Sequence, residues 1–310
     1  MERIREKFLF GHSGCPIRIF QEGNQRLFIK ESANQKYNER LVKQIEKQKR
    51  FKYPRSYISS VPVLNYFYDK NDIYTVIMPY VDHYNFYMVL CEEPPSKLNL
   101  ILERIIEYFT YGFQAKTPKV PGAAVLTSKL DSLERQIPCS ESDAKISEII
   151  KKTRLLLESD PSCFDFPQGD CHGDFTLDNM LFSRKDCDIV LIDFLDSFVE
   201  SPLIDVVKFR QDTKYHWYIY KNEMHYLDFK KVEIALAHFD RSIDRYLSNL
   251  PADPKLFLLL ELFNYLRILP YVQSNFMRDY IIKILAGLSR KVGYKGELLA
   301  DPFSIGRQTL

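Results

Sequence analysis

Residues 171–194, with the sequence CHGDFTLDNMLFSRKDCDIVLIDF, carry the polar residues that decide the fold prediction. Asp174 is followed five residues later by Asn179, and Asp193 lies fourteen residues beyond that. Phosphoryl transfer needs a carboxylate that orients the attacking hydroxyl and accepts its proton, together with oxygen ligands for magnesium. Asp174 suits the first task, and Asn179 and Asp193 suit the second because magnesium prefers hard oxygen ligands. The stretch therefore predicts a phosphoryl-transfer site.

The segment between Asn179 and Asp193 predicts a β-hairpin. An apolar run at 180–182 and an aliphatic run at 189–192 flank the polar segment 183–188, which is typical of strand, turn and strand. A hairpin returns the end of its second strand to the start of its first. The two expected magnesium ligands should therefore meet although they are distant in sequence.

Composition is that of an ordinary globular protein. The chain has 310 residues, 45% of them hydrophobic, with 43 basic and 41 acidic side chains and a net charge of +2. This balance gives no support to nucleic-acid binding. The six cysteines have no C-x-x-C spacing, and the N-terminus has no apolar stretch of signal-peptide length, so we expect a cytoplasmic protein with reduced thiols. The apolar segment 255–272 carries Glu261, Asn264 and Arg267 and predicts a core helix instead of a membrane span.

The polar motif resembles that of a known superfamily. Protein kinases carry H-R-D-L-x-x-x-N followed by D-F-G, whereas this chain has His172-Gly173-Asp174, Asn179 and then Ile192-Asp193-Phe194. The H-G-D-x-x-x-x-N and I-D-F version is similar to the aminoglycoside phosphotransferase and choline kinase superfamily. No A-P-E sequence follows, which counts against a protein kinase.

The resemblance implies an α+β, two-lobed, protein-kinase-like fold. Residues 1–78 would form a nucleotide-binding lobe with a small antiparallel sheet and one helix, and residues 79–310 the hinge and a larger, mainly helical lobe for catalysis and acceptor binding. We expect N-terminal strands at 7–10, 17–20, 26–30, 61–64 and 73–79. A turn at 11–14 lies where kinases cover the phosphates, although a plain hairpin turn is equally consistent with its Gly and Ser residues.

The resemblance assigns nucleotide-binding residues in the first lobe. Lys30 ends the strand LFIK and matches the strand lysine of kinases. Phe28 lies on the same face, where it would stack on the adenine; the alternative is a core phenylalanine. A glutamate of the helix at 35–51, either Glu39 or Glu46, would hold Lys30 on the phosphates. Glu39 is preferred because it lies nearer the helix start.

The hinge is expected at residues 78–81. In the resembling families one main-chain carbonyl and one N–H read the adenine there. Pro79 has no N–H but keeps its carbonyl, and Val81 keeps its N–H. Both residues are therefore assigned to the nucleotide site, together with ATP or another nucleoside triphosphate and Mg²⁺ as cofactors.

The second lobe is expected to be helical. Apolar residues at helical spacing predict helices at 98–115, 143–157, 228–250, 253–272 and 276–291. Residues 117–142, which are polar and contain Pro118, Pro121 and Pro138, are interpreted as a mobile loop near the substrate entrance or a connector.

Four residues are candidates for the acceptor pocket: Asp196, Glu200, Asp212 and Trp217. The alternative for Asp212 is a helical salt-bridge ladder with Asp205 and Lys208, which share one face. By the resemblance, Asp205 braces the catalytic loop and His172 orients it by hydrogen bonds. The aromatic residues at 215–226 would cap a sugar or cage a quaternary amine, although core packing is the more frequent role of such residues.

These features predict a small-molecule kinase that transfers phosphate from a nucleotide to a hydroxyl group. A sugar or amino sugar is the preferred acceptor, followed by choline- or ethanolamine-type amino alcohols and aminoglycosides. A nucleotide-binding pseudoenzyme that acts by interaction is the alternative of another class, but no catalytic group is missing from the motif. No membrane span or nucleic-acid partner is expected.

Overall fold

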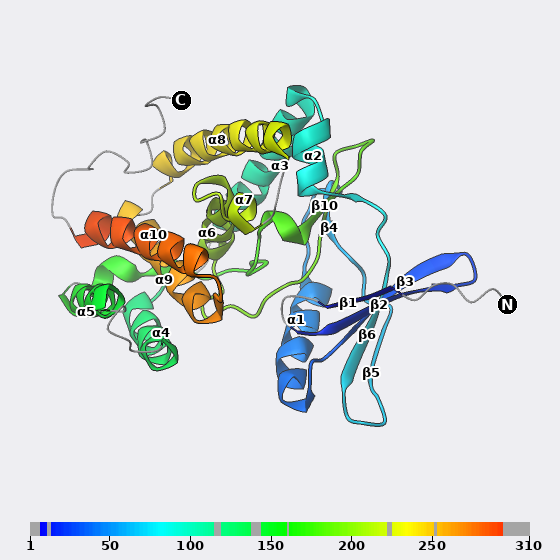
Figure 1. Cartoon of the computed structure of the whole chain (residues 1–310), viewed down its shortest axis with the longest axis horizontal. Coiled ribbons are helices and arrows are strands. Elements are labelled where there is room, and N and C mark those ends of the chain that lie inside the picture. Colours follow the sequence, from blue (N-terminus) through cyan, green and yellow to red (C-terminus); the bar gives the residue numbers. More distant parts are fainter. Residues whose placement is uncertain are drawn as a thin grey trace.

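The computed structural model describes residues 7–10, 14–114, 119–137, 144–159, 161–221, 225–250 and 253–293. It confirms the predicted α+β architecture. A small antiparallel sheet lies at the lower right of Figure 1, and the helices of the second half of the chain lie to its left and above it.

The first lobe is built on an antiparallel sheet. Within the described residues its strand order is β1-β2-β3-β6-β5. The strands are β1 (Lys7–Phe10), β2 (Pro16–Glu22), β3 (Gln25–Glu31), β5 (Asn65–Tyr68) and β6 (Tyr74–Pro79). The predicted turn at 11–14 lies outside the described residues except for Gly14. β6 continues to Pro79, one residue past the predicted end of the first lobe at residue 78. The lobe boundary between residues 78 and 79 stays a prediction.

The predicted helix at 35–51 is present as a short 3₁₀ turn, η1 (Gln35–Tyr37), followed by α1 (Asn38–Arg50). Leu41 and Ile45 of α1 are buried against Val76 and Met78 of β6, and these residues form the core of the first lobe. Burial of one helix face fixes α1 against the sheet.

The predicted strand at 61–64 is wrong. Residues 58–60 form β4 (Ile58–Ser60), and the next strand, β5, begins only at Asn65. Pro62 lies in the gap, where its missing N–H cannot contribute to a strand ladder. β4 belongs to the second sheet, where it pairs in parallel with a strand of the second lobe, β11 (Ile189–Leu191).

The hairpin after Asn179 is confirmed. β10 (Met180–Phe182) pairs with β11, and Met180 lies opposite Leu191. The main-chain N–H of Ile192 then donates to the carbonyl of Asn179 at 3.1 Å. With β4 and β7 (Tyr84–Asn85), the hairpin forms a sheet of order β4-β11-β10-β7 among the described residues.

The second lobe is mainly helical, as predicted. Its helices are α2 (Phe86–Glu92), α3 (Pro95–Gln114), α4 (Gly122–Gln136), α5 (Ala144–Ser159), α6 (Pro202–Thr213), α7 (Trp217–Lys221), α8 (Tyr226–Ser248), α9 (Pro254–Ile268) and α10 (Asn275–Gly293). Short 3₁₀ segments are η3 (Pro161–Phe164), η4 (Leu177–Asn179) and η5 (Leu269–Tyr271). Among the described residues, no helix is long and apolar enough to cross a membrane.

The interpretation of residues 117–142 as a loop is wrong for most of its length. α4 occupies this segment, preceded by β8 (Lys119–Val120), which pairs with β9 (Phe166–Pro167). Leu126, Leu130 and Leu133 form the buried stripe of α4, and Pro121 is its N-cap residue. Pro121 lies directly before the helix and does not interrupt it, and Pro118 and Pro138 lie outside the described residues. The polar composition of the segment concealed its amphipathic pattern.

Candidate active site

The catalytic loop brings Asp174 and Asn179 into contact. The side-chain amide of Asn179 donates to the main-chain oxygen of Asp174 at 2.8 Å and to its carboxylate at 2.9 Å. The NH₂ group makes both bonds, so the remaining side-chain oxygen of Asn179 is the atom suited to a cation. The predicted base and the first predicted magnesium ligand are thus adjacent.

His172 connects this loop to the strand that precedes Asp193. The N–H of Asp174 donates to Nδ1 of His172 at 3.2 Å, and Nε2 lies 2.8 Å from the carbonyl of Ile192. A main-chain N–H only donates and a carbonyl only accepts, so the ring must be neutral with its proton on Nε2. Burial lowers the pKa of His172 to about 4, in keeping with this tautomer. These contacts give His172 the geometry of its predicted orienting role.

One face of α6 holds the catalytic loop at three successive points. Asp205 accepts the N–H groups of His172 and Gly173 at 2.7 and 2.8 Å. Lys208 Nζ lies 3.1 Å from the carboxylate of Asp174. One turn further, Asp212 accepts the N–H of Leu177 at 2.8 Å. The three side chains that share this face of α6 therefore each contact the catalytic loop.

Two shifts in pKa follow from this arrangement. Burial raises the pKa of Asp174, but the positive charges of Lys208 and Arg267 outweigh it and hold that pKa below its usual value. Burial raises the pKa of Asp205 to about 6, against the opposing effect of its hydrogen-bond donors, one of which is the hydroxyl of Tyr108 at 2.8 Å. Both carboxylates are thus ionised at neutral pH, as a base and a hydrogen-bond acceptor need to be.

Gly173 occupies a position that only glycine fits. Its φ is +84°, and a Cβ there would lie 2.2 Å from the carbonyl oxygen of Leu195. The close approach places the loop against the segment after Asp193, where the N–H of Leu195 donates to the carbonyl of His172 at 3.0 Å. The residue that distinguishes the motif from H-R-D is therefore required by backbone geometry.

Lys30 and Asp193 meet across the two lobes. Nζ of Lys30 lies 2.7 Å from the carboxylate of Asp193, although 163 residues separate them. Burial lowers the pKa of Lys30, but the carboxylate of Asp193 outweighs this and the net shift is upward. The strand lysine and the second predicted metal ligand thus converge at one point.

Neither predicted glutamate contacts Lys30. Glu39 pairs with Lys43 at 2.9 Å and Glu46 pairs with Lys49 at 2.9 Å, both along the exposed face of α1. The face of α1 that packs on the sheet presents Leu41, Ile45 and uncharged polar residues instead. The expected lysine–glutamate pair is therefore replaced by the pair of Lys30 with Asp193.

The other nucleotide candidates lie on the strands around Lys30. Phe28 is partly buried and packs beside the core of the first lobe, two residues before Lys30 on β3. Pro79 is the last residue of β6, opposite Leu27, and Val81 follows in the connection to the second lobe. Their places agree with a site between the lobes, and their contact with adenine stays a prediction.

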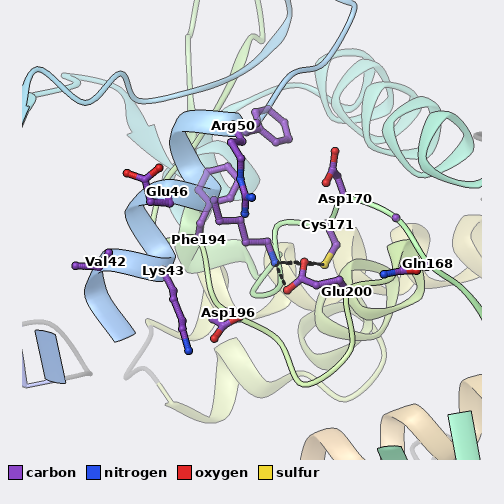
Figure 2. Close-up of a pocket in the computed structure, with 13 residues that line it drawn as sticks. Val42, Lys43, Glu46, Arg50, Gln168, Asp170, Cys171, Phe194, Asp196 and Glu200 are labelled. Atoms are coloured by element: carbon purple, nitrogen blue, oxygen red, sulfur yellow. Dashed lines mark hydrogen bonds and ion pairs between the residues drawn. The ribbon is translucent and has the colours of Figure 1, made fainter. Parts of the chain in front are cut away.

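The four acceptor candidates do not converge. Asp196 is exposed and lines a pocket of about 660 Å³ between α1 and the segments that flank the catalytic loop (Figure 2). Asp212 is 2% exposed beneath the loop, and Trp217 is partly buried against the main core. Glu200 lines the same pocket as Asp196, but its carboxylate is paired with a lysine of α1.

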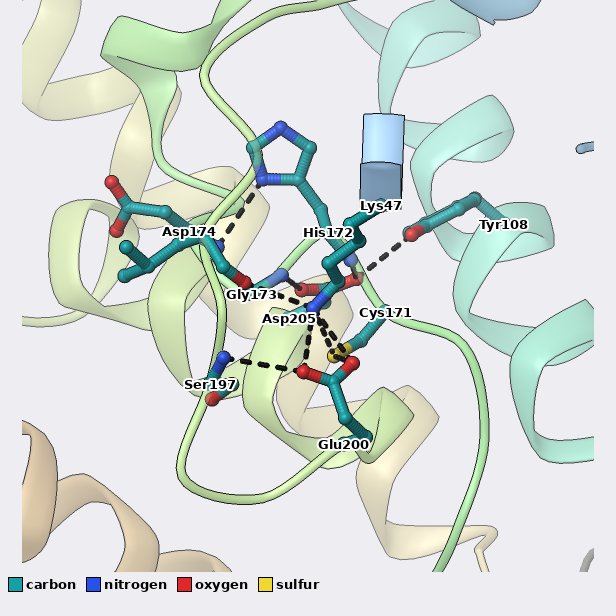
Figure 3. A network of polar contacts seen from close by, with 10 residues as sticks. Lys47, Tyr108, Cys171, His172, Gly173, Asp174, Ser197, Glu200 and Asp205 are labelled. Carbon is teal, nitrogen blue, oxygen red and sulfur yellow. Dashed lines mark hydrogen bonds and ion pairs between the residues drawn. The ribbon is translucent and has the colours of Figure 1, made fainter. Parts of the chain in front are cut away.

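That lysine, Lys47, joins α1 to the loop after Asp193. Its Nζ lies 2.7 Å from Glu200 and donates to the carbonyl of Leu195 at 2.9 Å. Glu200 also accepts the N–H of Ser197 at 3.2 Å, and Cys171 lies beside the pair, as Figure 3 shows. Helix α1 therefore contacts the segment after Asp193 through the ammonium group of Lys47.

Sequence reasoning gave no role at the catalytic loop to two cations, Lys47 and Lys208. Helical spacing placed Lys208 on one face with Asp205, but it did not show that this face meets the loop. Lys47 carried no such signal, because exposed and buried lysines look alike within a charged helix.

The donor set fits magnesium. Asn179 and Asp193 supply an amide and a carboxylate oxygen, which are hard ligands, and the hairpin brings their backbones together. Among the described residues, no group of three or more His, Cys, Asp or Glu side chains could hold a metal ion by itself. A cation held by one or two protein oxygens, with the rest of its shell from phosphates and water, is the arrangement magnesium uses.

Comparison with known proteins supports the same class. Residues 122–252 match the model of the Phosphotransferase enzyme family. A thermostable mutant of aminoglycoside phosphotransferase APH(4)-Ia in its apo form is 15% identical in sequence, with a TM-score of 0.61 over 93% of this chain and 94% of that one. The search of curated proteins found no match.

Two further solved structures share the fold. A ternary complex of thermostable APH(4)-Ia with AMP-PNP and hygromycin B is 14% identical, with a TM-score of 0.62 over 93% of this chain and 94% of that one. A GDP complex of a mutant aminoglycoside 2'-phosphotransferase-IIIa is 15% identical, with a TM-score of 0.56 over 94% of this chain and 92% of that one. The family match and the fold together confirm the predicted resemblance to the aminoglycoside phosphotransferase and choline kinase superfamily. They support a small-molecule kinase.

Proposed function

We propose that the chain is a magnesium-dependent kinase that transfers the terminal phosphoryl group of ATP or another nucleoside triphosphate to a hydroxyl of a sugar or amino sugar. The observation that carries this proposal is the contact between Asp174 and Asn179 beside the strand that leads to Asp193. The structural neighbour that binds AMP-PNP together with hygromycin B supports a nucleotide and a small acceptor in the same fold.

Asp174 is the proposed base. Its carboxylate, held by Asn179 and Lys208, would accept a hydrogen bond from the acceptor hydroxyl and take its proton as the oxygen attacks. His172 and Asp205 keep the loop in place through the main-chain N–H groups of residues 172–174. Such positioning is a main source of catalysis in phosphoryl transfer.

Lys30, Asn179 and Asp193 would bind the triphosphate and its cation. Magnesium, when bound, would neutralise charge on the transferring phosphoryl group. Lys30 would contact phosphate oxygens from β3, as its position next to Asp193 allows. Phe28, Pro79 and Val81 are the proposed adenine contacts, and the cytoplasm is the proposed location.

The test is a screen for ADP release with sugars, amino sugars, choline analogues and aminoglycosides as acceptors. Stimulation by one acceptor class, lost in Asp174→Ala while nucleotide binding persists, is the expected result. A base of this kind contributes roughly 10²–10⁴ in rate. No stimulation by any acceptor, with nucleotide still bound, would favour a pseudoenzyme instead.

A further inference from the structure

Lys208 is a buried lysine of α6 that contacts the proposed base. It is 7% exposed, and its Nζ lies 3.1 Å from Oδ1 of Asp174. The side chain of Asp174 itself remains 30% exposed, so its carboxylate is accessible to a bound molecule. Nζ of Lys208 also lies 3.4 Å from the side-chain oxygen of Gln211 on the same helix. The ammonium group is therefore held between a carboxylate and an amide oxygen.

Helix α9 fixes the amide that holds Lys208. The side-chain nitrogen of Asn264 donates to the same oxygen of Gln211 at 2.9 Å, and the hydroxyl of Tyr265 donates to the main-chain oxygen of Gln211 at 3.4 Å. Gln211 and Asn264 are both buried. Buried polar side chains that are hydrogen-bonded to one another are held in one arrangement, so the packing of α6 on α9 sets the position of Lys208.

One N–H of Lys208 is left for a further partner. A lysine ammonium has three N–H donors. Within the parts of the chain that the structure describes, Asp174 and Gln211 supply the two acceptors within hydrogen-bond distance of Nζ. Burial lowers the pKa of Lys208, and the charge of Asp174 opposes this shift. An additional oxygen atom on Nζ would stabilise the buried charge, so the third donor suits an oxygen of a bound molecule.

The two oxygens of the Asp174 carboxylate have different neighbours. Oδ2 accepts the side-chain amide of Asn179, the proposed cation ligand, at 2.9 Å, whereas Oδ1 faces Lys208. We therefore expect the cation and the triphosphate on the Oδ2 side. In-line displacement places the attacking oxygen opposite the leaving oxygen, which puts the acceptor hydroxyl on the Oδ1 side. A hydroxyl and an ammonium that each lie about 3 Å from one carboxylate oxygen can also contact each other.

We propose that Lys208 is a catalytic residue whose third N–H donates to the attacking oxygen of the acceptor. This inference rests on the proposed function and adds to it, because Lys208 would contact a reacting atom as well as hold the base. The fixed positive charge would stabilise the negative charge that develops on the attacking oxygen.

The step conserves atoms and charge. The hydroxyl proton passes to Asp174 while the attacking oxygen forms its bond to the terminal phosphorus. The bond from that phosphorus to the bridging oxygen breaks, and its electron pair leaves with the nucleoside diphosphate. Asp174 then releases the proton to solvent, and Lys208 keeps its three protons throughout.

The first test measures steady-state ADP release with the acceptor that the screen identifies. Lys208→Met removes the charge and keeps a side chain of similar length. We expect kcat to fall by about 100-fold or more, with the KM for nucleotide unchanged, because the lost contact is made to the acceptor. Lys185→Met, in the exposed turn between β10 and β11, is the control and should behave as wild type. An undiminished kcat in Lys208→Met would overturn the inference.

The second test measures binding without turnover. In the complex of ADP, Mg²⁺ and fluoroaluminate, the planar anion takes the place of the transferring phosphoryl group, and a water or hydroxyl takes that of the attacking oxygen. Calorimetry on the full chain should show that fluoroaluminate strengthens ADP binding by about 100-fold or more in the wild type. Lys208→Met should lose most of this gain and bind ADP alone as the wild type does, which also shows that the variant is folded. If Lys208→Met fails to fold, Lys208→Gln takes its place.

A double variant separates direct contact from an effect through the base. If Lys208 served only to hold Asp174, then Lys208→Met would add nothing to Asp174→Asn. We expect the double variant to bind the fluoroaluminate complex about tenfold more weakly than Asp174→Asn alone. Equal affinities of these two proteins would reject the contact with the attacking oxygen.

The outcomes distinguish this inference from the proposed function. Turnover of an acceptor by wild type and Lys208→Met at the same rate would reject the role of Lys208 and keep the kinase. A wild type that phosphorylates no acceptor, but whose fluoroaluminate complex depends on Lys208, would reject the proposed acceptors and keep the contact. A gain from fluoroaluminate that is equal in wild type and Lys208→Met would reject the contact.

Discussion

Nζ of Lys30 lies 2.7 Å from Oδ1 of Asp193, and this ion pair joins β3 of the first lobe to the loop after β11 in the second. Lys30 is 6% exposed, so its charge is largely shielded from solvent and meets the carboxylate of the other lobe. The pair marks the point where triphosphate and cation are proposed to bind.

Lys30→Met should raise the KM for nucleotide and lower kcat, because the variant loses the positive charge that faces the phosphates. We expect kcat/KM to fall by about 100-fold or more. Steady-state ADP release over a range of nucleotide concentrations measures this effect, with Lys36→Met, an exposed lysine of η1, as the control. Equal kinetics in both variants would show that Lys30 has no contact with the nucleotide.

Removal of a magnesium ligand should change the dependence on the metal. Asp193→Asn replaces a carboxylate by a neutral amide, so half-maximal activity should require more Mg²⁺, and chelation by EDTA should abolish activity in the wild type. Asp186→Asn, in the exposed turn between β10 and β11, is the matched control. A wild type that stays active after exhaustive chelation would contradict the proposed metal site.

Gly173→Ala should disrupt the catalytic loop. The added Cβ would lie 2.2 Å from the carbonyl of Leu195 at a residue whose φ is +84°, so the loop must shift and kcat should fall strongly. Gly23→Ala is the matched control, because Gly23 also has a positive φ, +58°, but nothing lies within 4 Å of its Cβ. We expect a cost of about 1–2 kcal/mol at Gly23 from backbone conformation alone, with kcat preserved; equal loss of kcat in both variants would refute the loop argument.

Lys47→Met should weaken the contact between α1 and the segment after Asp193. The variant leaves Glu200 without its lysine at a partly buried position, with side-chain exposures of 12% for Lys47 and 39% for Glu200. We expect the free energy of unfolding to fall by about 1–2 kcal/mol. Lys43→Met, whose pair with Glu39 is exposed, should cost much less, because solvent screens the attraction between exposed charges. Urea unfolding of both variants measures the difference, and an equal small loss would mean that the Lys47 pair contributes little.

The pH dependence of stability should contain a contribution from His172. Its pKa is about 4 in the folded protein, against about 6.5 in an unfolded chain. Between these values the unfolded state binds more protons, so stability rises with pH across this window and is lost as pH falls from 6.5 to 4. The contribution amounts to about 3 kcal/mol.

Urea unfolding of wild type and His172→Gln at several pH values isolates this contribution. The difference between the two proteins should grow in favour of the wild type from pH 4 to pH 6.5 and stay constant above it. A difference that does not change with pH would show that His172 is not a buried neutral imidazole.

Local sequence determined the central part of the site. The spacing of Asp174 and Asn179, and the apolar, polar and aliphatic runs that follow, predicted the hairpin because strands and turns depend on residues close together in the chain. The same principle explains the success with β3, α1 and the main helices. Two predictions from local sequence were wrong. Pro62 interrupts the strand that was predicted at 61–64, and the polar composition of residues 117–142 concealed the amphipathic pattern of α4.

Tertiary structure alone decided which charges meet. Glu39 and Lys30 are nine residues apart, yet the lysine pairs with Asp193, 163 residues away. Lys129 of α4 and Arg267 of α9 both lie near the ring of Phe198, and only packing brings these two helices to the same ring. A sequence pattern fixes the face of a helix that carries a charge, whereas the partner of that charge depends on how whole elements pack. The phosphoryl-transfer motif could therefore be predicted from the chain itself, and the partners of its charged side chains could not.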